Sequence, residues 1–191
     1  MKKDDVMLLT MRRGARTGFN TLLQRGFYLA GRSGMTVRTF LREVLGYDDA
    51  RIEGEVRTVF LNSSPMDGLD TTRLRDGDRL ALGSAMPGLV GICMGRDNPY
   101  KSFRSSIGLA REDEDGAGES IRVFVKIFSV LAVDTGEGVL ARGIEVDRAP
   151  LLALIDRERA NLLPEGGPGP SEILAALRNG EGPVRVRVRF A

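Results

Sequence analysis

Few residue types in this chain of 191 residues can perform chemistry. It contains no histidine and a single cysteine, Cys93. Without histidine, neither a Ser-His-Asp triad, nor acid-base catalysis by imidazole, nor a zinc site with imidazole ligands can be built. One cysteine also cannot form a disulfide within the chain. The remaining carboxylates, lysines, tyrosines and arginines form no catalytic group by spacing, so we expect no enzyme, no cofactor and no metal.

Cys93 lies in the segment Gly91–Gly95, whose sequence is GICMG. It is either a redox-active or persulfide-carrying thiol, or a small apolar residue that packs inside the protein, as free cysteines commonly do. The absence of a histidine partner favours the second interpretation. Four consecutive carboxylates at 112–115 lack the alternating spacing of calcium ligands and indicate a solvated loop. No glycine-rich phosphate loop is present.

The clearest charged pattern is the segment 184–190, VRVRVRF. Side chains alternate across a strand, so this segment places three valines and Phe190 on one face and Arg185, Arg187 and Arg189 on the other. The arginines form either a stripe that binds anions or a protein partner, or a solvated face that protects a half-buried strand from aggregation. Both interpretations stay open from the sequence.

The amino-acid composition limits the classes of protein to which this chain can belong. The chain is 42% hydrophobic and 28% charged, with 28 basic and 26 acidic residues and a net charge of +2. This is a globular composition, and its near-neutral charge argues against a generally polybasic nucleic-acid binder. The longest nearly apolar stretch, 123–133, is too short to cross a membrane, and the N-terminus lacks the apolar core of a signal peptide. We therefore expect no membrane association and a cytoplasmic location.

Hydrophobic periodicity predicts an α+β protein with helices and strands mixed along the chain. In the first half, Val37, Phe40, Leu41 and Val44 form a helical stripe that Thr36 can cap. Apolar, β-branched runs predict strands around it, and the DGD sequence at 76–78 predicts a tight turn. The expected order is strand 6–11, strand 21–30, helix 36–45, strand 56–61 and strand 79–82.

The second half begins with a linker at 92–120, which contains a short helix at 100–110 and an acidic loop at 111–120. We expect an α+β region over 121–191. Its predicted elements are a hairpin of strands 121–133 and 139–146 around the turn 134–138, helices 150–163 and 171–179, and the final strand 184–190.

The segments 36–41 (TVRTFL), 59–62 (VFLN), 67–71 (DGLDT) and 74–82 (LRDGDRLAL) resemble the ubiquitin-like β-grasp superfamily. Within it, they are similar to the sulfur carriers, namely the small subunit of molybdopterin synthase and the thiamine sulfur carrier. The resemblance covers residues 5–91 and implies a β-grasp domain over 1–91. It also implies a sheet face or edge that docks protein partners.

The chain departs from the sulfur carriers after the last expected strand. A carrier ends in a free Gly-Gly tail that is activated at its carboxylate, whereas here the corresponding stretch is 86–91 (MPGLVG) and 100 residues follow it. Gly91 could serve only after cleavage. The resemblance therefore implies the fold of the sulfur carriers for this chain more strongly than it implies their chemistry.

Three functions follow as hypotheses. The first is a non-enzymatic protein-interaction module, possible as a homo-oligomer if 184–190 pairs across a two-fold axis. The second is an accessory factor in sulfur transfer or in molybdenum or tungsten cofactor assembly. The third is a nucleic-acid- or ribosome-associated factor. The partner-binding residues we expect are Arg185, Arg187, Arg189, Met86, Pro87, Gly88, Gly91 and Cys93.

Overall fold

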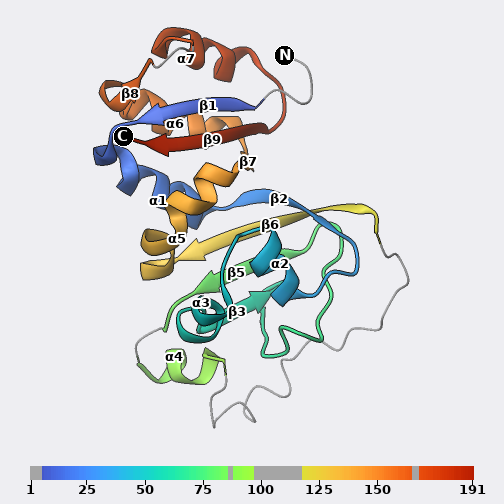
Figure 1. Ribbon diagram of the computed structural model, residues 1–191. Helices are drawn as coiled ribbons and strands as arrows, with labels where there is room; N and C mark the ends of the chain where they lie inside the picture. The colour runs from blue at the N-terminus through green and yellow to red at the C-terminus, as the bar shows by residue number, and fades with distance from the viewer. Residues whose placement is uncertain (1–5, 86–87, 97–117, 165–167) are drawn as a thin grey trace. The chain divides into compact units, whose positions relative to one another are not determined.

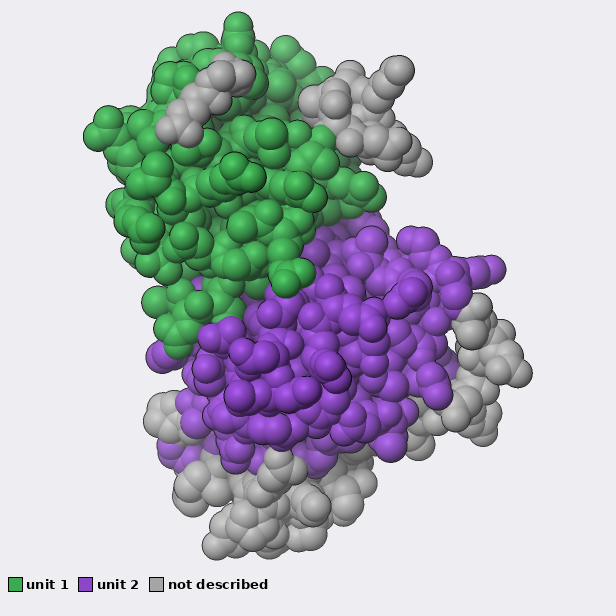
Figure 2. All heavy atoms as spheres, viewed as in Figure 1, with its two compact units in different colours: residues 1–27, 133–191 green, residues 28–132 purple. Residues whose placement is uncertain are grey.

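The computed structural model describes residues 6–85, 88–96, 118–164 and 168–191, and it has a mixed α+β architecture (Figure 1). The chain divides into two compact units (Figure 2). Unit 1 combines residues 1–27 with 133–191, and unit 2 comprises residues 28–132. Unit 2 is therefore an insertion between two segments of unit 1. This division differs from the expected boundaries at 91 and 121.

Unit 1 brings the first strand of the chain together with the last. β1 (Met7–Met11) pairs in parallel with β9 (Val184–Phe190), and the strand order in this unit is β7-β9-β1-β8. β7 (Ile144–Val146) and β8 (Leu162–Leu163) both pair antiparallel to their neighbours. The helices of the unit are α1 (Arg16–Arg25), α5 (Ser129–Arg142, whose first turn belongs to unit 2), α6 (Arg148–Arg157) and α7 (Pro170–Asn179).

The alternation predicted for 184–190 is confirmed. Val184, Val186 and Val188 are buried, while the three arginines between them are exposed. Phe190 packs its ring edge-on against Phe19 of α1, with the ring centroids 5.6 Å apart. One face of β9 thus belongs to the core of unit 1.

Unit 2 is a sheet with the strand order β4-β3-β5-β6-β2. β3 (Thr58–Leu61) pairs antiparallel with β4 (Ser64–Pro65) and β5 (Arg79–Gly83), and β5 pairs in parallel with β6 (Ser120–Phe128). β2 (Phe27–Arg32) lies beside β6. The amide of Ser33 donates to the carbonyl of Glu119, whereas the ring of Tyr28 contacts that of Phe124, so β2 and β6 run in opposite directions.

Among its described residues, unit 2 also has the short helices α2 (Val37–Glu43), α3 (Asp49–Gly54) and α4 (Gly88–Met94). The prediction of α2 is confirmed, including its cap, because the Thr36 hydroxyl accepts from the amide of Thr39. Its apolar stripe, Val37, Phe40 and Leu41, is fully buried. The inward residues of β6 are equally buried; they are Ile121, Val123, Val125 and Ile127.

The predicted strand over 21–30 is wrong in its first half. Residues 21–25 complete α1, and only residues from Phe27 onward are extended. The buried residues Phe19, Leu22 and Leu23 follow the i, i+3, i+4 spacing of a helix face, which continues a pattern begun before residue 21. A helix therefore separates β1 from β2, where we expected two consecutive strands.

The predicted hairpin over 121–146 is also wrong. Residues 134–138, expected as its turn, lie inside α5, and only 144–146 of the second strand are extended. Leu131, Thr135 and Val139 are buried at four-residue spacing, and Ala132, Gly136 and Leu140 repeat it one position on. This is helical periodicity, and it outweighs the turn preference of the two glycines.

The other predicted helices and strands occur with shifted ends. The helix expected at 150–163 ends at Arg157, after which the chain forms a short 3₁₀ turn and β8. The helix expected at 171–179 begins at Pro170, and the carboxylate of Glu172 accepts from the amide of Gly169. The helix expected at 100–110 and most of the acidic loop lie outside the described residues.

Candidate functional site

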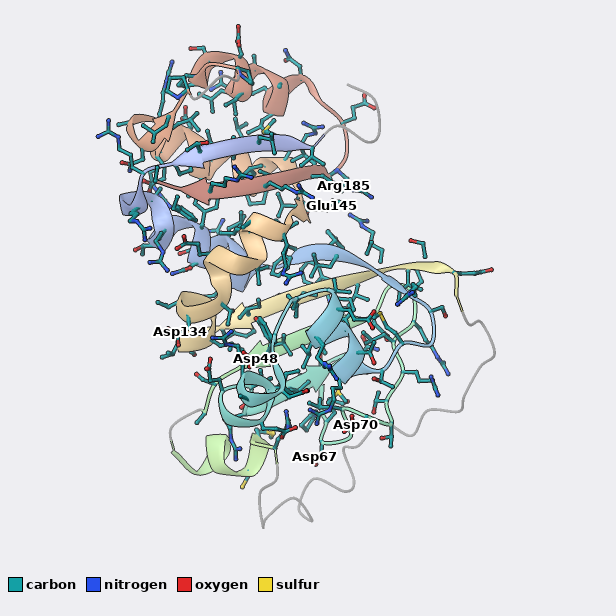
Figure 3. The ribbon with its side chains drawn as sticks, in the orientation of Figure 1. Asp48, Asp67, Asp70, Asp134, Glu145 and Arg185 are labelled. Carbon is teal, nitrogen blue, oxygen red and sulfur yellow. The ribbon has the colours of Figure 1, made fainter. Side chains whose placement is uncertain are left out.

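The expected arginine stripe lies on β9 in unit 1. Arg185, Arg187 and Arg189 are exposed on one face, and the register places Arg187 beside Leu8 of β1, which is 69% exposed. Arg185 lies close to Glu145 of β7, with 3.8 Å between guanidinium and carboxylate (Figure 3). The stripe is thus an exposed cationic face that Glu145 partly neutralises.

The position of β9 corrects one expectation. We expected 184–190 to pair across a two-fold axis, which requires a free strand edge. β9 instead pairs with β7 on one side and with β1 on the other. Both of its edges are occupied within unit 1, so it cannot form the sheet of a homo-oligomer.

Three of the other expected binding residues, Gly88, Gly91 and Cys93, lie in the helix α4. Met86 and Pro87 lie outside the described residues. α4 begins at Gly88, which has a φ of +80°. Gly91 is buried in the middle of this helix, and Cys93 is half-buried near its end. No residue of α4 is charged.

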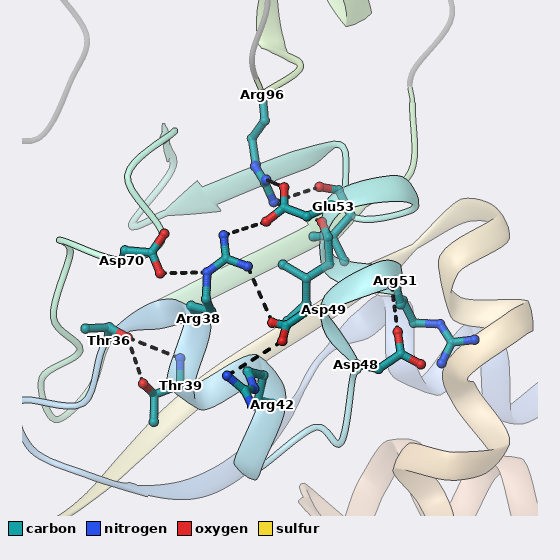
Figure 4. A network of polar contacts seen from close by, with 12 residues as sticks. Thr36, Arg38, Thr39, Arg42, Asp48, Asp49, Arg51, Glu53, Asp70 and Arg96 are labelled. Carbon is teal, nitrogen blue, oxygen red and sulfur yellow. Dashed lines mark hydrogen bonds and ion pairs between the residues drawn. The ribbon is translucent and has the colours of Figure 1, made fainter.

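A polar network around Arg38 connects α2, α3 and the loop 67–72 (Figure 4). The Arg38 guanidinium donates to Asp70 and to Glu53, both at 2.6 Å, and lies 3.7 Å from Asp49. The hydrogen bonds that Arg38 donates to Asp70 and Glu53 raise the pKa of Arg38. The hydrogen bond from Arg38 lowers the pKa of Glu53. Because each charge is satisfied by an opposite one, this network holds elements together.

Arg96 extends that network into the interior of unit 2. Its side chain is 4% exposed, and its guanidinium donates to the carbonyls of Ile52 and Val56 and to the carboxylate of Glu53. Its backbone amide donates to the carbonyl of Arg57 at 2.6 Å. Arg96 therefore satisfies carbonyls in and just after the last turn of α3, and it links the chain beyond α4 to α3 and to the residue before β3.

A different group of residues forms the best candidate site. The sheet of unit 2 has an outer face, opposite its buried side chains, to which β2, β3, β5 and β6 contribute aromatic and basic residues. We call it the basic aromatic face. Its members are Tyr28, Arg32, Phe60, Arg79, Arg122, Phe124, Lys126 and Phe128.

Strand register brings these side chains together. Arg79 of β5 is directly opposite Phe124 of β6. The guanidinium carbon of Arg79 lies 4.7 Å from the centroid of the Phe124 ring, and the ammonium of Lys126 lies 5.9 Å from it. Cations at these distances are attracted by the negative face of the ring. The aromatic residues therefore hold the cations on the surface of the sheet.

The closest stack on this face joins β2 to β6. The guanidinium carbon of Arg122 lies 3.6 Å from the centroid of the Tyr28 ring. Tyr28 in turn meets Phe124 edge-on, with centroids 5.0 Å apart and an angle of 60° between the rings. Arg122 is exposed, while its backbone amide is fixed by the carboxylate of Asp76 at 2.7 Å. The guanidinium group of this exposed residue is thus held at stacking distance from a ring.

The charge of the basic aromatic face is of one sign. β2, β3, β5 and β6 together contain four cations and no aspartate or glutamate. Of the four, Arg32 is paired with Glu43 of α2 at 2.8 Å. The face can therefore attract an anionic partner and offer it flat aromatic and guanidinium surfaces.

Sequence reasoning missed this face, although one signal for it was present. Residues 121–128 alternate between aliphatic residues and Arg122, Phe124, Lys126 and Phe128, as a strand with one buried and one functional face would. Tyr28 and Arg79 could not be linked to that strand, because their neighbourhood arises only from the pairing of segments far apart in the chain.

Other features of the described residues are weaker candidates for a functional site. A hollow of about 110 Å³ between α1 and α6 is too small for a metabolite-sized ligand. Among the described residues, no group of histidine, cysteine, aspartate or glutamate is arranged to hold a metal ion. In the same part of the chain, no helix has the length and apolar character needed to cross a membrane.

We also compared the chain with known proteins. No protein-family model, no curated protein and no solved structure matches it.

Proposed function

We propose that the protein is a non-enzymatic, cytoplasmic binding module in which unit 2 is a β-grasp-like domain with permuted strands. In the topology that the resemblance implies, the first strand lies between the second strand and the last, parallel to the last. In unit 2, β6 occupies that place, between β2 and β5 and parallel to β5. β6 therefore has the position of the first strand in the sheet, although it follows β5, the last strand, in the sequence.

The order of the remaining elements supports the same assignment. β2, α2, β3, β4 and β5 follow one another as the second strand, the helix and the last three strands would. Three of the four segments that carry the resemblance fall on α2, β3 and β5, and the fourth, 67–71, lies in the loop between β4 and β5. Only the first strand is replaced: β1, which we expected in this role, pairs with β9 and β8 in unit 1.

The basic aromatic face is the proposed binding surface, and its partner is anionic. The observation that carries this proposal is the concentration of Arg79, Arg122 and Lys126 on aromatic rings in strands that contain no carboxylate. A surface of one sign attracts the opposite charge and accelerates encounter with it. Binding of this kind needs no catalytic side chain, which agrees with a chain that has no histidine.

The geometry favours this function over sulfur-carrier chemistry. A carrier tail at Gly91 would require cleavage inside α4, where Gly91 is buried. Cleavage there would also separate β6 from the rest of the unit 2 sheet, since β6 lies at 120–128. A sheet that depends on a strand beyond residue 91 cannot release a folded carrier that ends at this residue.

Heparin chromatography tests the proposed surface. We expect the Arg79→Gln/Arg122→Gln variant to elute from a heparin column at lower salt than the wild type, because it loses two cations of the face. The matched control, Arg157→Gln/Arg178→Gln, removes two exposed arginines of unit 1 and should elute close to the wild type. Equal elution of the two variants would contradict the proposed function.

A further inference from the structure

We propose that the basic aromatic face binds single-stranded nucleic acid, with bases stacked on the Tyr28–Arg122 pair and on Phe124. This inference rests on the proposed function, since it names the anionic partner of the same face. It goes beyond that function because it adds a contact to the bases, which a partner recognised by charge alone would not need.

The stacking surfaces carry the first step of the argument. A guanidinium plane held flat on an aromatic ring presents a second flat, polarisable side, and unpaired bases stack on both aromatic rings and arginine planes. Arg122 lies at 3.6 Å from the Tyr28 centroid, which is stacking distance, and it is exposed. A base placed over Arg122 would complete a three-layer stack of ring, guanidinium and base.

The second step concerns the phosphates. The guanidinium carbon of Arg79 and the ammonium of Lys126 lie 4.7 and 5.9 Å from the centroid of the Phe124 ring. A base that contacts the exposed part of Phe124 would place its backbone near these cations. Each neutralised phosphate releases counterions, so binding should weaken with salt by a slope of about −0.7 per phosphate for a single strand.

The third step concerns the length of the surface. From Arg122 to Phe128, β6 advances six residues, or about 20 Å at the usual rise of a strand. Phe128 is 38% exposed at the far end, and Phe60 is half-buried on β3. The face therefore offers stacking positions along a row of this length, which suits several successive nucleotides of an extended strand.

The aromatic residues also distinguish between classes of polyanion. An acidic protein segment would satisfy the cations but would gain little from flat planes held against rings. In a duplex, the faces of the bases are already stacked on one another and cannot reach Arg122 or Phe124. Single-stranded nucleic acid is the anionic partner that uses both properties of the face.

Fluorescence anisotropy of the full-length protein with labelled 12-nucleotide RNA, the same sequence as single-stranded DNA, and its DNA duplex tests the proposal. We expect either single strand to bind at least about tenfold more tightly than the duplex. The RNA and DNA arms show which sugar is preferred. Equal affinity for single strand and duplex would overturn the proposal.

Two variants test the stacking contact directly. Phe124→Leu should weaken single-strand binding about tenfold, which corresponds to the loss of one stacked base. Arg122→Lys keeps the charge and loses the planar group, so it should weaken binding to the oligonucleotide. Arg157→Gln is the control, and its affinity should equal that of the wild type. Arg122→Lys also provides the test if Phe124→Leu does not fold.

The outcomes separate this proposal from the proposed function. Retention on heparin that depends on Arg79 and Arg122, together with oligonucleotide binding that neither Phe124→Leu nor Arg122→Lys weakens, would overturn the nucleic-acid proposal and leave the anion-binding face intact. If neither heparin nor any oligonucleotide is bound through the face, both proposals fail.

Discussion

Arginines serve different purposes in this chain, and their surroundings distinguish them. Arg96 is 4% exposed and donates to backbone carbonyls, whereas Arg122 is exposed and stacked on a ring. A buried guanidinium that satisfies carbonyls contributes to stability, and an exposed one that is held flat can contact a partner. The sequence alone cannot separate the two, because burial depends on which segments pack together.

Arg96 supports a prediction about stability. Arg96→Met should destabilise unit 2 by about 2 kcal/mol, since it leaves the carbonyls of Ile52 and Val56 without this donor in the interior. Chemical denaturation would measure the loss, and faster amide exchange in α3 would locate it. Arg42→Met removes an exposed arginine that lies 3.7 Å from Asp49 and should change stability by less than about 0.5 kcal/mol. Equal effects of the two variants would contradict the role of Arg96.

The pKa of Glu53 gives a pH-dependent prediction. Arg38, mainly through its hydrogen bond, lowers the pKa of this carboxyl below its ordinary value of 4.5. A lowered pKa in the folded state means that the ionised carboxylate stabilises the fold above pH 4.5, and that this contribution is lost as the pH falls through the lowered pKa. The Tm of the wild type should therefore exceed that of Glu53→Gln at pH 7, with the difference vanishing in acid. A difference in Tm that stays constant from pH 7 into acid would show that Glu53 stabilises the fold by packing and not by its charge.

At the scale of elements, the sequence predicted those whose pattern is local. α2 and β9 follow from a helical stripe and a strict alternation, and β3 and β5 from short apolar runs next to turns. The failures at α1 and α5 share a cause. In both, apolar residues are frequent enough to fit a strand, and the deciding information is which of them become buried.

Two glycines of α5 give a testable prediction about the helical structure of this segment. Gly138 has open space where a Cβ would lie, so Gly138→Ala should stabilise the protein by about 1 kcal/mol, the helical preference of alanine over glycine. A Cβ on Gly136 would lie 2.9 Å from Leu23 and 3.0 Å from Asn20, so Gly136→Ala should gain less or destabilise. Thermal unfolding of both variants measures the contrast. If 134–138 were a hairpin turn, neither substitution would follow helical propensity.

At the scale of the whole molecule, the two compact units differ from the boundaries that we expected at 91 and 121. The motifs on α2, β3 and β5 belong to one unit, as expected, but in that unit the strand between β2 and β5 comes from 120–128 instead of 6–11. The parallel pairing of β5 with β6 is a long-range contact that no local pattern encodes. The basic aromatic face depends on this pairing, and for that reason the sequence did not reveal it.

The boundaries themselves are testable with fragments. A fragment of residues 28–132 contains every strand of the unit 2 sheet except Phe27 of β2, and it should unfold cooperatively and give dispersed amide resonances in NMR spectra. A fragment of residues 1–91 lacks β6, which separates β5 from β2, and it leaves β1 without β9. It should therefore show no cooperative transition by circular dichroism. The opposite result, a folded 1–91 and an unfolded 28–132, would restore an N-terminal domain that ends at Gly91 and would make a carrier tail at that glycine chemically possible.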